Sequence, residues 1–418
     1  MSCLTFPGRL HVPGKHVFVL YGIVKGIEIG LDRRGFLPSL VQGRRSKQTS
    51  KKDGCVVKRI LLTTGGTGGH IFPALAVADT LRTRFPACRI MFVGGTRGPE
   101  RELATNAGLE FTALPAQGIL GKGLRSIPAL ISMGVGVFKA MGLIRSFKPE
   151  VIVGFGGYAG FSPVMAGVLR KVPTAIHEQN SIPGMSNRML GSRVDRVFVS
   201  FPDQTGYFPA DRVCLSGNPV RSEIIALGAG EVSRSTHTKN LLILGGSQGA
   251  TAINEAVMNV LPALCAEHIT IWHQTGKKDL QRVRDRYNAI CPEARVEAFI
   301  QDMAGAYAFA DVVLCRAGAT TLAELAIAGK PSILIPFPYA AHDHQLKNAR
   351  YLETSGAALV LVQSYLQEVN LSQVIADLLG MPEKLRAMGC AARKMGKPDS
   401  AEIIVDELEE LACATRRN

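Results

Sequence analysis

The sequence of 418 residues lacks the features that mark several common protein classes. Its nine cysteines form no CxxC pair and no short cluster with histidine, so neither a zinc site nor a disulfide framework is predicted, and a reducing cytoplasm is the expected compartment. The apolar stretch from Val17 is interrupted by Lys25 and Glu28, which makes it too short and too polar to span a bilayer. Basic and aromatic residues are not interleaved, which argues against nucleic-acid binding.

Motifs of several nucleotide-dependent enzymes are missing as well. No glycine-rich loop ends in Gly-Lys-Ser/Thr, as a Walker A loop does, and none is a clean GxGxxG followed by a ribose-binding acid. An ATPase and a nicotinamide dehydrogenase are therefore disfavoured. No DxD-type pair stands on a predicted strand-end loop, so we expect no bound metal ion and no cofactor.

Acidic residues are fewer than basic ones, and the imbalance is uneven. The formal net charge is +14, yet ten Lys/Arg and only three acidic residues fall within residues 1–57, so this segment carries half of the charge. We expect residues 1–57 to be a disordered basic extension, with a start of translation downstream of Met1 as the alternative. A signal peptide is disfavoured because no small-residue cleavage site follows the apolar run.

From Lys58 onward, short apolar runs alternate with helix-like stretches, which is typical of an α/β protein with parallel sheets covered on both faces. The predicted strands form two sets: RILLTT, RIMFVGG, EVIVGFGG, PTAIHEQ and RVFVS, then NLLILGGS, ITIWHQTG, DVVLCRAG and PSILIPFP. The break at LSGNPVRSE predicts two Rossmann-like domains, residues 58–217 and 218–395. We also expect a C-terminal helix over 396–418 that packs back on the first domain. The cleft between the domains is the expected ligand site.

Three glycine-rich loops each follow a predicted strand and open a predicted helix: GGTGGH (65–70), GFGGYAG (154–160) and GGSQGA (245–250). Unpaired backbone N–H groups and the positive end of the helix dipole favour phosphate at such a junction, although glycine turns also occur for packing alone. In the second set, Gly318 stands at another strand-to-helix junction with Glu324 following in the helix. Its carboxylate suits the two hydroxyls of a ribose, but an ordinary first-turn glutamate is the alternative.

Several motifs together resemble the MurG family of bacterial N-acetylglucosaminyltransferases. They are, in the family's order, GGTGGHIFPALAVA, GFGGYAG, HEQNSIPGMSNR, GNPVR, GGSQGA, FIQDMAGAYAFADVVLCRAGATTLAELAIAGKPSILIPFP and HDHQLKNAR. The resemblance covers about residues 58–415. It implies a GT-B fold of two Rossmann-like domains, with the donor UDP-GlcNAc held mainly by the second domain and a lipid-linked muramyl-pentapeptide acceptor held by the first.

The resemblance also implies which residues contact the substrates. Ser247 matches a diphosphate contact, Ile300 a main-chain contact to uracil, and Arg221 a position near the phosphates. Ser247 as a helix cap, Arg221 in a surface ion pair and Asn180 as a turn residue are the alternatives. The full implied set is Thr67, Gly68, Gly69, Asn180, Arg221, Ser247, Ile300, Ala319, Thr320, Thr321, Leu322, Ala323, Glu324 and Gln345.

The reaction needs a base and a way to neutralise the departing diphosphate. Without a metal ion, helix N-termini, loop amides and Arg221 would have to stabilise the negative charge. His70, beside such a positive end, should favour its neutral form and could take the proton of the acceptor C4 hydroxyl, giving inversion at the anomeric carbon. A structural ring that bonds loop carbonyls is the alternative role, and His177 and Glu178 remain competing bases. Tyr158 is expected either at the acceptor pyrophosphate or in the core.

A polyprenyl acceptor implies work at a membrane surface, at the cytoplasmic face of the bacterial cell membrane. Residues 122–148 combine apolar positions with five Lys/Arg, as an interfacial helix does, although periodicity alone favours a core helix. Anionic lipid and other cell-wall synthesis proteins are the expected partners. The competing activity is a GT-B transferase that glycosylates diacylglycerol. One departure from the family stands at His344, where members often have glutamine.

Overall fold

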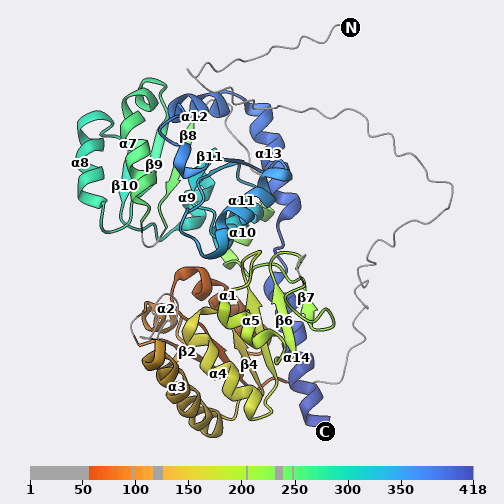
Figure 1. Cartoon of the computed structure of the whole chain (residues 1–418). Helices are drawn as coiled ribbons and strands as arrows, with labels where there is room; N and C mark the ends of the chain where they lie inside the picture. The colour runs from red at the N-terminus through yellow and green to blue at the C-terminus, as the bar shows by residue number, and fades with distance from the viewer. Residues whose placement is uncertain are drawn as a thin grey trace, which may run out of the picture. The chain divides into compact units, whose positions relative to one another are not determined.

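A computed structural model of the protein describes residues 56–96, 98–115, 126–203, 206–230, 239–246 and 249–417 (Figure 1). The expected extension through residue 55, Ser247 and the first residues of the expected interfacial helix lie outside these ranges.

The N-terminal half, which we define as residues 56–217, builds a seven-stranded sheet with strand order β3-β2-β1-β4-β5-β6-β7. All of its strand pairs are parallel. The strands are β1 (Arg59–Thr63), β2 (Arg89–Gly94), β3 (Glu110–Ala113), β4 (Val151–Gly154), β5 (Thr174–Glu178), β6 (Arg196–Val199) and β7 (Val213–Cys214). The helices are α1 (Gly68–Arg84), α2 (Glu100–Asn106), α3 (Ser126–Phe147), α4 (Gly157–Leu169) and α5 (Met185–Gly191).

The C-terminal half, residues 218–395, repeats this plan in a six-stranded parallel sheet with strand order β10-β9-β8-β11-β12-β13. The strands are β8 (Asn240–Leu244), β9 (Thr270–Gln274), β10 (Arg295–Glu297), β11 (Val312–Cys315), β12 (Ser332–Leu334) and β13 (Ala358–Val360). The α-helices are α6 (Ser222–Ala229), α7 (Thr251–Ala266), α8 (Leu280–Ile290), α9 (Met303–Phe309), α10 (Ala319–Ala328), α11 (His344–Thr354), α12 (Leu371–Leu379) and α13 (Pro382–Met395). A short 3₁₀ turn, η2 (Ala341–Asp343), lies between β12 and α11, and another, η3 (Gln363–Tyr365), lies between β13 and α12. Helix α14 (Ser400–Arg417) ends the described chain.

Both faces of each sheet are covered by helices (Figure 1), which explains why the strands read as continuous apolar runs. Successive residues of β1 divide between two cores: Ile60 and Leu62 lie in a core with α1 and α14, and Leu61 lies in a core with α3 and α4. In β8, Leu241 and Leu242 divide in the same way. The predicted α/β, GT-B-like fold class is confirmed.

The sequence analysis missed the strands at the sheet edges. β3, β7, β10 and β13 contain two to four residues each, and most of their residues are only partly buried. β3 and β10 contain charged or polar residues and β7 has only two residues, so these three strands lack the apolar run that identifies a central strand. β13 lies within the apolar residues 357–362 and was missed although this run is present.

The cysteines also depart from expectation. Cys265, at the end of α7, forms a disulfide with Cys291, which directly follows α8, and Cys413 is disulfide-bonded as well. The two Cα atoms of the first pair lie 6.3 Å apart. Their separation of 26 residues gives no CxxC-like pattern, so only the packing of α7 against α8 brings them together.

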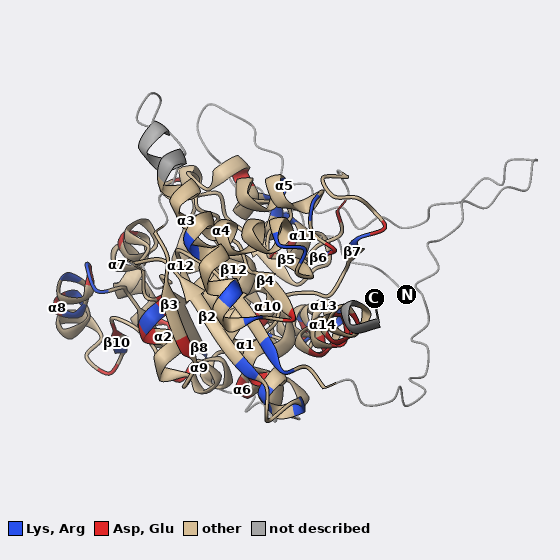
Figure 2. Cartoon of the chain, turned by 90° about the horizontal axis from the view of Figure 1, so that it is seen from below, with Lys and Arg blue, Asp and Glu red and all other residues tan. Residues whose placement is uncertain are grey.

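The C-terminal helix α14 packs against α1 of the N-terminal half. Its residues Ile404, Val405 and Leu408 are fully buried in the same core as the α1 side chains. Its acidic residues (red in Figure 2) include Asp406 and Glu409, which both pair with Arg84 at the end of α1. Burial of one helix face is therefore supported by ion pairs at its margin.

Replacement of Leu408 tests how much this packing stabilises the chain. Leu408→Ala should lower the free energy of unfolding by about 2 to 5 kcal/mol, because it removes a fully buried side chain and leaves a cavity. Denaturant unfolding followed by circular dichroism gives the value. Leu411→Ala, at a partly buried position of the same helix, is the matched control and should cost clearly less. Equal losses for the two variants would contradict the packing described here.

Candidate functional site

A cavity lies where three loops of the N-terminal half meet the η2 segment of the C-terminal half. The loops follow β1, β4 and β5, which are neighbours in the sheet, so their ends lie at one edge. The cavity is lined by His70, Gly156, Gly157, Tyr158, Glu178, Asn180, Ile182, Pro183, Gly184, Met185, Ser186, Asn187, Ala341, His342 and His344. His70, Tyr158, Glu178 and Asn180, all singled out in the sequence, are thus brought to one place.

The first two glycine-rich loops touch each other directly. Gly157 has a φ of 75°, and a Cβ atom added there would lie 2.1 Å from the carbonyl oxygen of Gly65. A Cβ on Gly65 would in turn lie 2.7 Å from the Cβ of Ala159. These glycines are therefore required for packing of loop on loop, whatever ligand the loops bind.

His70 belongs to a chain of buried side-chain hydrogen bonds. Its Nδ1 lies 2.9 Å from Oε1 of Gln179. The Gln179 Nε2 donates to the Phe155 carbonyl at 2.9 Å and lies 3.0 Å from Nδ1 of His177. His177 Nε2 lies 2.9 Å from the carbonyl oxygen of Gly217. Complete burial lowers the pKa of His177 to about 4, so this ring is neutral at neutral pH.

Glu178 is buried and accepts four hydrogen bonds. Its Oε1 accepts from the backbone N–H and the side-chain amide of Asn180, at 3.0 and 3.3 Å. Its Oε2 accepts from the Gly184 N–H and from the Asn187 amide, both at 2.9 Å. The carboxylate therefore fixes the loop between β5 and α5.

Two residues expected to contact the substrate connect the halves of the chain. Thr320 Oγ1 donates to the Gly69 carbonyl oxygen at 2.8 Å. That carbonyl lacks its usual helical donor because residue 73, four positions on, is proline. Asn180 Oδ1 accepts from the Asn348 amide at 3.2 Å, and Asn348 Oδ1 accepts from the Ser181 N–H.

Arg221 and Glu324 form a buried ion pair. Arg221 Nη2 lies 3.0 Å from Glu324 Oε1, and the Tyr307 hydroxyl donates to the other oxygen at 2.8 Å. Burial raises the pKa of Glu324, while Arg221 and Tyr307 act in the opposite direction. The Arg221 guanidinium also lies over the ring of Phe72 of α1, 4.9 Å from its centroid. Glu324 is thus a buried glutamate, whereas Arg221 is partly exposed and its Nε also lies 3.8 Å from the exposed Glu223 carboxylate.

The remaining expected donor contacts lie in the C-terminal half. The backbone N–H of Ile300 donates to Gln274 Oε1 at 3.1 Å. Gln345 Oε1 accepts from the Phe337 N–H at 3.0 Å. His344 Nδ1 lies 2.8 Å from the Ala341 carbonyl oxygen, so this ring also braces the loop. Ala319, Thr321, Leu322 and Ala323 belong to the first turns of α10.

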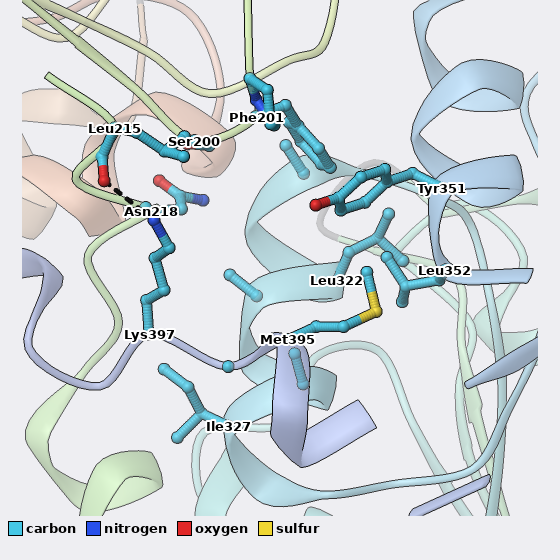
Figure 3. A pocket seen from close by; sticks show the side chains of 16 residues that line it. Ser200, Phe201, Leu215, Asn218, Leu322, Ile327, Tyr351, Leu352, Met395 and Lys397 are labelled. Atoms are coloured by element: carbon cyan, nitrogen blue, oxygen red, sulfur yellow. Dashed lines mark hydrogen bonds between the residues drawn. The ribbon is translucent and has the colours of Figure 1, made fainter. Parts of the chain in front are cut away.

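A second, apolar pocket lies beside the connection between the halves (Figure 3). Leu215 and Asn218 of the connection, Leu322 and Ile327 of α10, and Tyr351 of α11 are among its lining residues. Phe201 meets Tyr351 edge to face, with ring centroids 5.2 Å apart (Figure 3). None of the residues implied as bases lines this pocket.

Sequence reasoning missed the partners that fix the expected residues. Gln179 stands between two singled-out residues of HEQN, but an amide carries no catalytic pattern of its own. Tyr307 and Phe72 lie 17 and 149 positions from the residues that they contact, and only the fold brings them near. Within the described ranges, no group of three or more His, Cys, Asp or Glu side chains is placed to hold a metal ion.

Comparison with known proteins gives a consistent result. The glycosyltransferase family 28 N-terminal domain matches residues 60–199, and the C-terminal domain of the same family matches residues 240–404. The chain is 54% identical over 372 residues to the UDP-N-acetylglucosamine–N-acetylmuramyl-(pentapeptide) pyrophosphoryl-undecaprenol N-acetylglucosamine transferase of Nitratidesulfovibrio vulgaris (strain DSM 19637 / Miyazaki F), covering 85% of this chain and 97% of the relative. A protein of the same name from Solidesulfovibrio magneticus is 50% identical, covering 85% and 98%.

A solved structure agrees with the sequence relatives. MurG of Acinetobacter baumannii superposes with a TM-score of 0.66 at 31% identity, covering 84% of this chain and 99% of that one. The expected resemblance is confirmed, and the chain belongs to the MurG family of N-acetylglucosamine transferases within glycosyltransferase family 28.

Proposed function

We propose that this chain transfers N-acetylglucosamine from UDP-GlcNAc to the C4 hydroxyl of undecaprenyl-pyrophosphoryl-MurNAc-pentapeptide, with inversion at the anomeric carbon. Peptidoglycan synthesis, and through it cell shape and division, is then its cellular role. The observation that carries the proposal, beside the family, is the cavity between the loops after β1, β4 and β5. It presents His70 to an acceptor held on the N-terminal half.

His70 is the base that the geometry favours among the three candidates. Both ring nitrogens of His177 are engaged, one with Gln179 and one with a backbone carbonyl. Glu178 accepts four hydrogen bonds from the loop that follows it and from Asn187 of α5, so it has little capacity left for a proton. His70 lines the cavity and uses only Nδ1 among the described contacts, which leaves Nε2 for the acceptor hydroxyl.

The departing UDP would be neutralised by protein groups around the donor. Arg221 lies 3.0 Å from Glu324 of α10, and this helix begins at Ala319 without a side-chain cap for its first N–H groups. Glu324 orients the guanidinium from one side and Phe72 packs on its face. A guanidinium held in this way offers further donors to a phosphate without a large loss of side-chain freedom.

The acceptor lipid requires contact with a membrane surface. Within the described residues, no helix is both long and apolar enough to cross a membrane. Helix α3 buries Ala140 and Ile144 in the core, yet leaves Phe138 with 77% of its surface exposed. Lys139 and Arg145 lie exposed on the same helix. An exposed aromatic ring flanked by cations suits the interface of an anionic membrane, and we propose that α3 lies there.

His70→Ala tests the base assignment and the reaction together. Transfer of labelled GlcNAc to the muramyl-pentapeptide lipid should fall about 100-fold to 10,000-fold, the usual effect of losing a general base. The affinity for UDP-GlcNAc, measured by calorimetry, should stay unchanged. Near-normal turnover would remove His70 as the base, whereas a wild-type protein that glycosylates diacylglycerol instead of the muramyl lipid would overturn the function.

The Arg221–Glu324 pair allows donor binding and stability to be separated. Arg221→Met should lower the free energy of unfolding by about 3 to 5 kcal/mol, because the buried Glu324 carboxylate loses its cation. Adding Glu324→Gln should recover much of this stability, since no buried charge remains. Affinity for UDP-GlcNAc should stay at least about tenfold reduced in the double variant, because the phosphate cation is still missing.

The exposed pair between Arg386 and Glu383 provides the matched control for this series. Arg386→Met should change neither unfolding nor donor affinity measurably, as expected for a solvated pair. If the double variant bound UDP-GlcNAc as the wild type does, neither residue would be part of the donor site.

Phe138→Ser tests the membrane contact. Binding to vesicles that contain anionic phospholipid should weaken about tenfold to 150-fold, because burial of a Phe side chain contributes about 1.5 to 3 kcal/mol. Turnover of a short-chain acceptor in solution should not change. Tyr365→Ser, at another exposed aromatic position, is the control and should bind vesicles normally. Equal vesicle binding by the Phe138 variant and the wild type would exclude α3 as the contact.

A further inference from the structure

Gln179 occupies a position in which its amide can point only one way. Its side chain is buried, with 2% of the residue exposed, between His70 and His177. One end of this hydrogen-bond chain is the Phe155 carbonyl, and the other is the Gly217 carbonyl. Carbonyl oxygens only accept hydrogen bonds, so each fixes the direction of the bond that it receives.

The directions follow from these two ends. The group that lies 2.9 Å from the Phe155 oxygen must carry hydrogen, so it is the amide nitrogen of Gln179. His177 must carry its hydrogen on Nε2 to reach the Gly217 oxygen, and its neutral ring therefore has a lone pair on Nδ1. That lone pair accepts the second hydrogen of the Gln179 amide, at 3.0 Å. Both amide hydrogens are thereby used.

The amide oxygen is then left facing His70. Because an amide oxygen can only accept, the His70 Nδ1 at 2.9 Å must be the donor. We propose that Gln179 is the positioning residue that holds His70 in the tautomer with hydrogen on Nδ1 and a lone pair on Nε2. This inference rests on the proposed function, in which His70 Nε2 takes the acceptor proton.

The packing around the ring supports the same assignment. Gly156 has a φ of 89°, and a Cβ atom there would lie 3.0 Å from Nδ1 and 3.1 Å from Cε1 of His70. The ring edge that bonds Gln179 is therefore pressed against a backbone that only glycine allows. Rotation of the ring away from Gln179 would lose both this contact and the hydrogen bond.

This arrangement has a defined role in the transfer step. The acceptor O–H bond breaks as its proton passes to His70 Nε2, and the oxygen forms a bond to the anomeric carbon. The bond from that carbon to the β-phosphate oxygen breaks, and UDP leaves with the electron pair. The resulting imidazolium keeps its Nδ1–H donated to the Gln179 oxygen, so no other side chain has to move. A neutral amide orients the ring without adding a negative charge, unlike the aspartate of a catalytic triad.

Two variants of Gln179 test the acceptor that it offers to His70. Gln179→Met keeps the size of the side chain but removes the acceptor, so kcat should fall about tenfold to 100-fold while the affinity for UDP-GlcNAc stays unchanged. Gln179→Glu keeps an acceptor for Nδ1 but has no amide hydrogens for the Phe155 carbonyl and the His177 Nδ1 lone pair. A protonated carboxyl group can donate to one of these two acceptors, so this variant should be less stable than the wild type and still retain more activity than the Met variant.

The tautomer itself can be read without any turnover. Protein labelled with ¹⁵N-histidine, with His70 assigned by comparison with His70→Asn, should show in the wild type at pH 8 a protonated Nδ1 and an unprotonated Nε2. Gln179→Met should give averaged shifts for the two nitrogens. This readout distinguishes the two ideas: failure of GlcNAc transfer by the wild type would overturn the function, whereas the nitrogen shifts test the positioning alone.

Ser162→Ala is the control for loss of a buried hydrogen bond in the same half of the chain, since its hydroxyl donates to the Met133 carbonyl. It should leave kcat and the His70 shifts unchanged. A hydrogen on Nε2 of His70 in the wild type would overturn the proposal. So would a Gln179→Met variant that is folded, binds UDP-GlcNAc and turns over normally.

Discussion

The parallel pairing of β1 with β4 is the constraint on which the site depends. It aligns Thr63 with Gly154, so the loops that follow the two strands leave the sheet side by side. They then approach so closely that Gly157 lies against the Gly65 carbonyl. His70 lies in the first turn of α1 after the first loop, Phe155 belongs to the second loop, and Gln179 directly follows β5 beside them. The orientation of one imidazole is thus set by the order of three central strands.

The halves of the chain are connected by groups that the family resemblance also implies as donor contacts. Pro73 leaves the Gly69 carbonyl without a helical partner, and the Thr320 hydroxyl takes its place. If Thr320 turns to a phosphate, as the resemblance implies, that link is given up. The Phe72 ring packed against the Arg221 guanidinium is another link of this kind, and so is the hydrogen bond from the Asn348 amide to Asn180. Contacts between the halves and contacts with the donor therefore draw on the same small set of side chains.

The sequence was sufficient for the central strands, the two-domain plan and the family, because each depends on local pattern. Leu61 and Leu62 belong to an apolar run that any buried parallel strand shows. The edge strands β3, β7 and β10 could not be predicted because they have no such run. The disulfide between Cys265 and Cys291 could not be predicted because it depends on how two helices pack. In the site, residue types identified His70 and Glu324. Their partners Gln179 and Tyr307 stand within the quoted motifs, but neither residue type indicates its contact, so the pairing needed the fold.

The roles proposed for His70 and Arg221 rest on one physical principle: each polar group is held by a partner that leaves its working atom unused. Gln179 accepts a hydrogen bond from Nδ1 of the His70 imidazole, so Nε2 can accept the proton. Glu324 forms an ion pair with Nη2 of Arg221, so other N–H donors of the guanidinium can bind a phosphate. Fixing such groups before the substrates arrive lowers the cost of reorganisation during transfer. In this chain the partner that faces the base is neutral and the partner that faces the cation is charged, because the base must release its proton again whereas the guanidinium must remain charged throughout.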